Sequence, residues 1–464
     1  MLQTDTPSVL APLVIEALGP AGPYRTRNRV SIADVVGTPV AELSLVPRLY
    51  VARTMAALRA ARTMPLDDRL AALSRAGDLF ATGEVAGMSV AQYEETVCRL
   101  GTPLSNVRTA IDTIRASAAA AYRSVRAARP IGAVEDWRDP LVRDGHGVWI
   151  RRGDVFAVHA AGNHPAVHSL WLEALALGYR VAIRPSRREP LTPHRLVTAL
   201  RESGFADDHV VTLPTDYDGA DEILRQADLS MVYGGQDVID KYADDPTVLP
   251  NGPGRSKILV TADSDWRDYL DVIVESVSWD GGVGCINTTA VFIEGDPSPL
   301  AQALAERLAA IPSLPLQDPR AVLPVHPVDT ARTYERHLLA KAAGAKAWLG
   351  GDGVVDPLGD GSAVLRPAVY QLDSPTAEQA AIELPFPCVW VAPWTRGSGA
   401  APLANSLVLT AITRDEQLLD ELLADPSIKN LYIGGHPTYW QRPGIPHDSY
   451  LADFLMRTKA VIRG

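Results

Sequence analysis

The chain has 464 residues, is 47% hydrophobic and carries a formal net charge of −11 at pH 7. Its acidic balance, without a long basic run, argues against nucleic acid and anionic membranes as partners, and no apolar run reaches the roughly 18 residues that a membrane-spanning helix needs. Its three cysteines, Cys98, Cys285 and Cys388, lack the spacing of a metal or disulfide framework, so we expect a protein of the reducing cytoplasm.

The first 150 residues are expected to be helical between two irregular stretches. Residues 1–45 are rich in proline and glycine, which favours irregular structure. From residue 46 to 122 apolar side chains recur at the helical period, as at Leu66 and Leu70. Residues 130–147 then combine proline, glycine and charge before a short apolar strand, so we interpret them as an extension that leaves the main body.

Two units in which strands and helices alternate are expected to follow. In the first, we predict strands at 155–159, 180–183, 210–213 and 229–232 and helices at 165–178, 193–204, 220–227 and 237–243. Thr192 is the expected N-cap of the helix at 193–204. The second unit, from about 257 to 433, has predicted strands at 258–260 and 289–293, a helix at 300–310, a strand pair at 364–370 and a loop at 350–361. Such alternation indicates parallel sheets with helices on both faces, and ligands bind beyond the carboxyl ends of their strands.

Cys285 lies in a loop of small residues that precedes the predicted strand at 289–293. Gly281, Gly282 and Gly284 would let a ligand approach the sulfur closely. A reactive cysteine needs such access because its thiolate is the nucleophile. A small buried hydrophobic side chain is the alternative, and most free cysteines are of that kind.

Three loops that follow predicted strands of the first unit also carry polar groups. Asn163 could donate its amide to an oxyanion or could cap the next helix. The run 184–188 suits a ribose or a phosphate but also a solvated turn, and the glycine pair 234–235 could face a pyrophosphate. His164 and His168 have the i, i+4 spacing of a metal site, but no further ligands accompany them, so we predict packing or substrate contact rather than a metal.

Together these runs, in their order and spacing, resemble the aldehyde dehydrogenase superfamily over nearly the whole chain. The resemblance implies an α/β, aldehyde-dehydrogenase-like fold with two Rossmann-type parallel-sheet domains and an oligomerisation arm. It places a dinucleotide-binding domain at residues 1–130 and 150–255, a catalytic domain at 256–433, and the arm and C-terminal tail at 131–149 and 434–464. It also implies a homodimer or homotetramer.

The same resemblance implies roles for individual residues. Cys285 falls at the family's nucleophile, and Asn163, in Asn-His-Pro, at its oxyanion donor. The implied cofactor-binding residues are Arg184, Ser186 and Arg187 near the adenosine ribose, Gly234 and Gly235 near the pyrophosphate, and Glu383 and Phe386, in Glu-Leu-Pro-Phe-Pro, with Glu383 at the nicotinamide ribose.

Two departures from the family pattern bear on function. Hydrolytic members have a Glu 34 residues before the nucleophile, where this chain has Asn251. An amide cannot take a proton from water, so a thioester on Cys285 would not be hydrolysed efficiently. Members without that Glu use a thiol acceptor or reduce acyl thioesters, and the runs around Asn251 and Glu383 also resemble the fatty acyl reductases of bacterial bioluminescence. Arg187 stands where NAD-preferring members carry Glu, so NADP(H) is expected in preference to NAD(H).

The sequence therefore predicts an NADPH-dependent reductase that converts an acyl thioester, on coenzyme A or an acyl carrier protein, to an aldehyde through an acyl-Cys285 intermediate. The alternative is NADP-dependent oxidation of an aldehyde to an acid, with His159 or His164 as the base. A binding or scaffold protein without turnover is disfavoured because both Cys285 and Asn163 are present.

Overall fold

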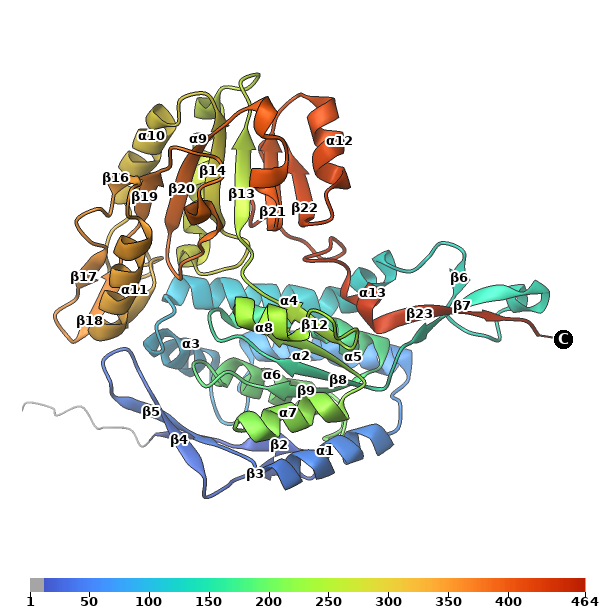
Figure 1. Ribbon diagram of the computed structural model, residues 1–464. Coiled ribbons are helices and arrows are strands. Elements are labelled where there is room, and N and C mark those ends of the chain that lie inside the picture. Colours follow the sequence, from blue (N-terminus) through green and yellow to red (C-terminus); the bar gives the residue numbers. More distant parts are fainter. Residues whose placement is uncertain (1–11, 464) are drawn as a thin grey trace, which may run out of the picture.

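Two seven-stranded sheets form the cores of two domains (Figure 1). The structure, a computed structural model, describes residues 12–463. The first sheet has the order β12 (Val248–Asn251), β11 (Leu229–Tyr233), β8 (Val155–His159), β9 (Arg180–Arg184), β10 (Val210–Thr212), β2 (Ala17–Gly19), β3 (Gly22–Tyr24). The second has the order β16 (Lys346–Leu349), β19 (Ala368–Gln371), β20 (Cys388–Trp394), β14 (Thr288–Glu294), β13 (Ser256–Val260), β21 (Ser406–Ile412), β22 (Ile428–Ile433). Because most neighbouring strands are parallel, the expected fold of two Rossmann-type domains is confirmed.

The strands of the first sheet are apolar throughout because helices cover both faces. Successive side chains of a strand point to opposite sides. Phe156 and Val158 of β8 therefore pack with α2 (Leu66–Thr82), α4 (Leu104–Ala127), α5 (Leu172–Leu177) and α6 (Leu191–Glu202). Val155 and Ala157 pack on the other face with α1 (Arg48–Ala60) and α7 (Tyr217–Gln226). Of the first domain's remaining helices, α3 (Val90–Arg99) packs against α4, and α8 (Gln236–Tyr242) connects β11 to β12.

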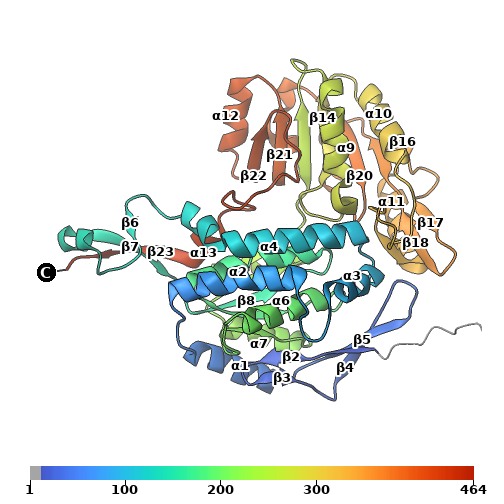
Figure 2. The same ribbon diagram turned by 180° about the vertical axis from the view of Figure 1, so that it is seen from behind.

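The second domain repeats this plan. Ile258 and Val260 of β13 pack with α9 (Leu270–Ser278) and α10 (Ser298–Ala309). Leu259, between them, packs on the opposite face with α11 (Val328–Lys341) and α12 (Glu416–Ala424). Figure 2 shows α4 along the side of the first domain that faces the second. Helix α4 therefore forms part of the interface between the domains, where the hydroxyl of Ser105 donates to Ala321 O of the second domain at 2.7 Å.

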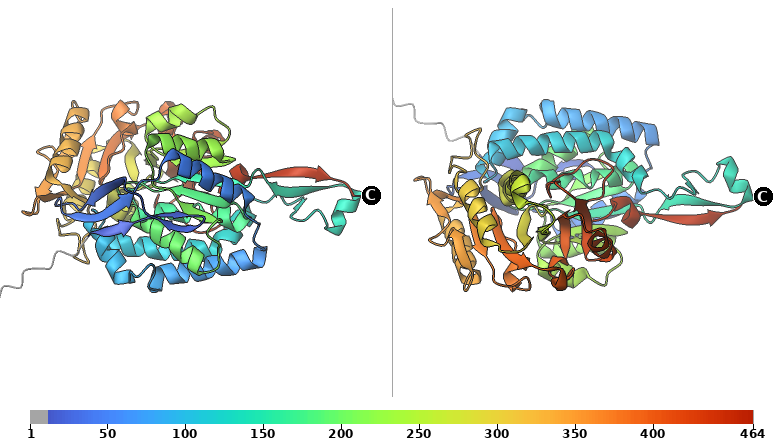
Figure 3. Two further views of the ribbon diagram at one scale, coloured as in Figure 1. Left: turned by 90° about the horizontal axis from the view of Figure 1, so that it is seen from below. Right: turned by 90° about the horizontal axis from the view of Figure 1, so that it is seen from above.

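An arm projects from the first domain (Figure 3). It is a three-stranded sheet of order β23 (Met456–Val461), β7 (His146–Arg151), β6 (Ala133–Val134). Strand β23 pairs antiparallel with the whole of β7. The helix α13 (Leu451–Leu455) precedes β23 and packs against α5. None of the helices in residues 12–463 has the length and apolar character needed to cross a membrane.

The prediction of irregular structure for residues 1–45 was wrong over residues 13–44. Besides β2 and β3, this segment forms a sheet of β1 (Leu13–Ile15), β5 (Pro39–Ser44) and β4 (Arg29–Ala33). Strands of three to six residues separated by Pro and Gly are too short to show a clear period-2 pattern. Residues 1–11 of the prediction lie outside the described part of the chain.

Two further local predictions were wrong. The helix α6 begins at Leu191, and the carboxylate of Glu189 rather than the hydroxyl of Thr192 accepts from its first backbone N–H groups, at 2.9 Å. The predicted strand pair at 364–370 is two strands of different sheets. β18 (Ser362–Leu365) lies between β15 (Val325–Pro327) and β17 (Val355–Pro357), whereas β19 belongs to the large second sheet. β17 also falls inside the predicted loop at 350–361.

Candidate active site

A cavity of about 1060 Å³ lies where the two domains meet the C-terminal tail. Much of its wall comes from loops that follow the carboxyl ends of the first sheet's strands, as expected for a parallel sheet. These wall residues are Ala160–Asn163 after β8, Ser186 and Arg188 after β9, Gly234 and Gln236 after β11, and Gly252–Arg255 after β12. The second domain contributes Cys285 and Glu383, and the tail contributes His447, Asp448 and Ser449.

The loop that carries Cys285 is held by close backbone packing. A Cβ atom on Gly254 would lie 1.8 Å from the carbonyl oxygen of Cys285, so only glycine allows this approach. Gly282 has φ +68° and faces the backbone of Pro387 in the same manner. Asn287 fixes the loop further, since its Oδ1 accepts from Gly284 N at 2.8 Å and its Nδ2 donates to Ser276 O of α9 at 3.2 Å. The cysteine is therefore presented from a rigid support.

His447 is the polar neighbour of the Cys285 sulfur. Its Nε2 lies 3.8 Å from Cys285 Sγ, and its Nδ1 lies 3.8 Å from Asp448 Oδ2. Burial lowers the pKa of His447, but the interactions of the ring with Asp448 and Cys285 outweigh it and raise that pKa to about 10. The imidazole therefore carries a proton at neutral pH and can stabilise a thiolate. Sequence reasoning missed His447, because no motif or periodicity marks it and its contact spans 162 residues.

Asn163 lies on the same wall as Cys285. Its Nδ2 donates to Val283 O at 3.0 Å, and its buried Oδ1 accepts no hydrogen bond from the described residues. The amide has a second N–H that this bond does not use. The capping alternative for Asn163 was wrong, because His164 caps the short helix η2 (Pro165–Ser169) with its ring Nδ1, which accepts from Ala166 N.

The predicted ribose-binding residues lie at the end of β9. Ser186 lines the cavity, and a Cβ atom on Gly162 would lie 2.3 Å from its Oγ, so glycine leaves this corner open. Arg184 is partly buried, its Nε has no hydrogen-bond partner in residues 12–463, and burial lowers its pKa, with Arg187 adding to the effect. Arg187 is exposed and does not line the cavity, whereas its neighbour Arg188 does.

Of the other predicted cofactor-binding residues, Gly234 and Glu383 lie on the wall of the cavity, whereas Gly235 and Phe386 do not. Gly234 lines the cavity, and Gly235 is the residue before the first turn of α8. Glu383 lines the cavity too, where its Oε2 accepts from Arg255 N at 2.9 Å and burial raises its pKa. Phe386 is only 1% exposed and packs in the core of the second domain, so the structure does not place it on the cavity wall.

The histidines that the sequence singled out lie apart from the nucleophile. His159 and His168 are buried, and burial lowers the pKa of each to about 3. His168 accepts a hydrogen bond from Trp171 Nε1, which fits the packing role, and His164 Nε2 lies 3.1 Å from Asp280 Oδ2. None of the three lines the Cys285 cavity. Within residues 12–463 no group of three or more His, Cys, Asp or Glu side chains could hold a metal ion.

Comparisons with known proteins agree with this geometry. The model of the aldehyde dehydrogenase family matches residues 40–410. Among solved structures, the chain is similar to an NAD-dependent aldehyde dehydrogenase from Sinorhizobium meliloti, with a TM-score of 0.80, 18% identity, and coverage of 98% of this chain and 96% of that one. An indole-3-acetaldehyde dehydrogenase complexed with NAD+ has a TM-score of 0.79 at 16% identity, with 96% of each chain covered. A gamma-glutamyl-gamma-aminobutyraldehyde dehydrogenase from Burkholderia cenocepacia J2315 has a TM-score of 0.77 at 16% identity, also with 96% of each chain covered. At these identities the structural likeness is one of fold.

Proposed function

Because the chain belongs to the aldehyde dehydrogenase family of oxidoreductases, we propose that it reduces an acyl thioester to an aldehyde with NADPH, through an acyl-Cys285 intermediate. The thioester is carried by coenzyme A or by an acyl carrier protein. The observation that carries the proposal is Asn251 at the end of β12, which gives the wall of the Cys285 cavity an amide. An amide cannot accept a proton from an attacking water molecule.

The carboxylates of the cavity support this choice. Among the described residues, two carboxylates line the cavity, those of Glu383 and Asp448. Glu383 is bonded to the backbone of Arg255, and Asp448 lies beside the His447 ring. The contact of Glu383 with a backbone N–H and that of Asp448 with the charged imidazole weaken both as bases for water, so we expect an acyl group on Cys285 to persist until a reductant or a thiol removes it.

The residues on the wall suit the steps of this reaction. His447 already holds a proton at neutral pH, and the Cys285 thiolate beside this cation attacks the thioester carbonyl. The free N–H of Asn163 donates to the oxyanion, and the departing thiolate takes a proton from His447. NADPH, when bound, supplies the hydride that turns the acyl carbon into a thiohemiacetal. Collapse of the thiohemiacetal releases the aldehyde and restores the Cys285 thiolate, and one proton is consumed for each NADPH oxidised.

The walls beyond the nucleophile fit a phosphorylated dinucleotide. Gly162 and Gly234 leave space that a side chain would fill, since a Cβ on Gly234 would lie 2.3 Å from Val238 Cγ2. Of the three arginines at the end of β9 and in the loop after it, Arg188 lines the cavity and Arg184 and Arg187 are its near neighbours in sequence, and none of the three makes an ion pair with residues 12–463. Their charge favours a 2′-phosphate on the ribose, and hence NADP(H) over NAD(H).

A second candidate function, NADP-dependent oxidation of an aldehyde to an acid, is favoured by one observation. His447 stands 3.8 Å from the sulfur, and acylation of Cys285 removes the thiolate that helps to raise the pKa of the imidazole. A neutral imidazole could then activate water. Neither His159 nor His164 has this position, since both lie outside the cavity wall.

The progress curve with an aldehyde and NADP+ distinguishes the two functions. The thioester reductase should show a burst of about one NADPH per active site, then slow turnover until coenzyme A or pantetheine is added. Cys285→Ala is the control and should show no burst. Linear acid formation without a burst and without thiol dependence would establish aldehyde oxidation instead.

A further inference from the structure

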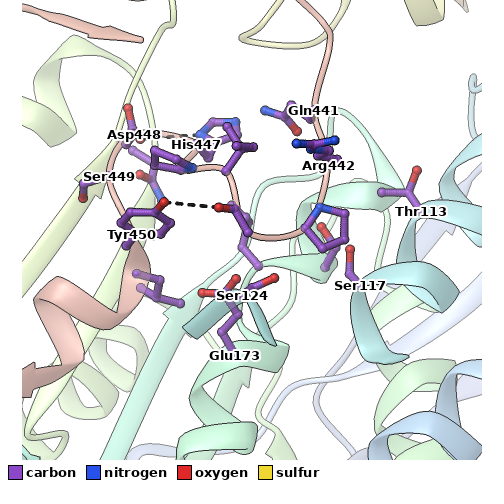
Figure 4. Close-up of a pocket in the computed structure, with 18 of the residues that line it drawn as sticks. Thr113, Ser117, Ser124, Glu173, Gln441, Arg442, His447, Asp448, Ser449 and Tyr450 are labelled. Carbon is purple, nitrogen blue, oxygen red and sulfur yellow. Dashed lines mark hydrogen bonds and ion pairs between the residues drawn. The ribbon is translucent and has the colours of Figure 1, made fainter. Parts of the chain in front are cut away.

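A second cavity, of about 220 Å³, adjoins the cavity of the nucleophile (Figure 4). Its walls come from α4, from the η2–α5 segment and from tail residues 441–451. Asn251, His447 and Asp448 line both cavities. A substrate that reacts at Cys285 can therefore place the rest of its acyl group in this side cavity, an inference that rests on the proposed covalent role of Cys285.

The volume restricts the acyl group. Pockets for drug-sized ligands occupy about 300–1,000 Å³. The side cavity, at about 220 Å³, is smaller and would hold roughly seven water molecules at ~30 Å³ each. The volume of the side cavity therefore suits a short acyl group.

Hydroxyl groups line one wall of the side cavity. Thr113, Ser117 and Ser124 are spaced four and seven residues apart on α4, so they share one face of the helix. Thr113 donates to the backbone of Thr109, but the hydroxyls of Ser117 and Ser124 make no hydrogen bond with residues 12–463. Ser124 is only 7% exposed, so its hydroxyl is largely withdrawn from bulk water. Figure 4 shows these side chains directed into the cavity.

A carboxylate completes the floor. Glu173 of α5 lies beside Ser124 in Figure 4, and within residues 12–463 it forms neither an ion pair nor a hydrogen bond. Burial alone raises its pKa, to about 7. Two cations line this cavity among the described residues: His447 lies beside the nucleophile, and Arg442 lies at the side opposite Glu173 (Figure 4), with its guanidinium 5.5 Å from the ring of Trp440. The floor therefore offers hydrogen-bond acceptors that the protein itself leaves without donors.

We infer that the substrate's acyl group is short and ends in a hydrogen-bond donor, an amino or hydroxyl group, that binds Glu173 and the serine hydroxyls of α4. An apolar end would leave these polar groups without partners in a confined space, and a site built for a donor rejects the analogue that lacks it. A carboxylate at the end of the acyl group would be repelled by the negative charge of Glu173. An ammonium end would pair with that charge.

The test compares coenzyme A thioesters of equal length: hexanoyl, ω-hydroxyhexanoyl, ω-aminohexanoyl and adipoyl. We expect kcat/KM to be roughly 100-fold higher for the preferred donor-bearing substrate than for hexanoyl, and lowest for adipoyl. Comparing the hydroxy and amino substrates identifies the donor. Glu173→Gln should reduce the rate with the amino substrate more than the rate with hexanoyl, and Ser124→Ala should weaken the same preference. Glu202→Gln, on the exposed end of α6, is the matched control for the loss of one carboxylate.

Equal or higher kcat/KM for hexanoyl would overturn the inference, and so would a Glu173→Gln variant that slows all four substrates equally. Two further measurements separate this outcome from failure of the thioester mechanism. Mass spectrometry of Cys285 after exposure to each thioester without NADPH reports acylation directly. Oxidation of hexanal and ω-hydroxyhexanal by NADP+ reports the same preference in the other direction. If no thioester acylates Cys285, the proposed function fails, and the aldehyde pair still decides the inference.

Discussion

At the scale of single residues, the reactivity of Cys285 depends on a side chain from a distant part of the chain. His447 is the polar group beside the sulfur, and Asp448 favours its charged form. The other two thiols are protected, because burial raises the pKa of Cys98 to about 12 and that of Cys388 also. All three cysteines lie in the described part of the chain, so alkylation at neutral pH should report on Cys285 alone.

His447→Gln should slow the alkylation of Cys285 by iodoacetamide and lower turnover by roughly 10²–10⁴-fold, because the proton acceptor and the cation beside the thiolate are both lost. Stopped-flow alkylation and steady-state kinetics measure the two effects. His337→Gln, on the exposed face of α11, is the control. An unchanged alkylation rate would show that His447 does not act on the thiol.

Arg187→Glu should shift the cofactor preference toward NADH. A charge-assisted hydrogen bond to the 2′-phosphate contributes about 1.5–3 kcal/mol, so wild-type protein should bind NADPH roughly ten- to a hundredfold more tightly than NADH. Fluorescence titration of both cofactors gives the dissociation constants. Arg143→Glu makes the same charge change in the arm and should leave the ratio alone. Equal constants in the wild type would remove the case for NADP(H).

At the scale of elements, the last strand of the second sheet holds the loop that carries His447. Asn430 of β22 is buried, and its Nδ2 donates to Leu407 O at 2.8 Å and also to His447 O. The tail is anchored again by Thr438, whose backbone N–H donates to Ser276 Oγ at 3.1 Å, and by Tyr439, whose ring stacks on Trp279 at 4.1 Å. The position of the His447 imidazole therefore depends on the packing of β22 and α9.

Asn430→Ala should lower the free energy of unfolding by roughly 2–3 kcal/mol, because two carbonyl groups lose a buried donor. It should also reduce turnover, since His447 is no longer held. Urea unfolding and limited proteolysis within residues 435–449 measure the effects. Gln417→Ala, which removes an exposed side-chain amide from α12, should leave both unchanged. Full activity with normal proteolysis would show that the loop is held by other contacts.

The sequence could predict the helices and strands in which apolar residues recur at a regular spacing, and the loop residues that follow those elements. The apolar strand β8 and the loop with Asn163 were recognisable because strand–loop–helix units place polar groups at one sheet edge. The strands before residue 45 were not, since each is short and two of them, β1 and β2, also pair with strands far along the chain. His447 could not be found either, because an irregular loop has no period and only the tertiary structure brings its imidazole to the sulfur.

At the scale of the whole molecule, the arm offers an edge for association. Strand β23 lies at the edge of the arm sheet, and residues 457–460 are exposed. An exposed edge strand presents unpaired backbone groups to another chain. We propose that this edge joins copies of the protein into a homodimer or homotetramer.

Removal of residues 457–464 should convert the oligomer into a monomer of about the mass of one chain, while the two domains keep their fold. Light scattering coupled to size exclusion gives the mass, and circular dichroism checks the fold. Arg457→Glu with Lys459→Glu keeps the strand but reverses its charge, and tests the same edge with less disturbance. A wild-type protein that is monomeric at micromolar concentration would contradict the proposed role of the arm.

The late position of His447 in the chain also has a consequence during biosynthesis. The cysteine and the imidazole that activates it are 162 residues apart, so at about 5–20 residues per second a ribosome needs roughly 8–32 s to add the second after the first. Throughout that interval the nascent chain displays Cys285 without its activating neighbour. In the mechanism proposed above, the thiol therefore gains its activating imidazole only after the tail has emerged and docked, and the unfinished polypeptide carries Cys285 without it.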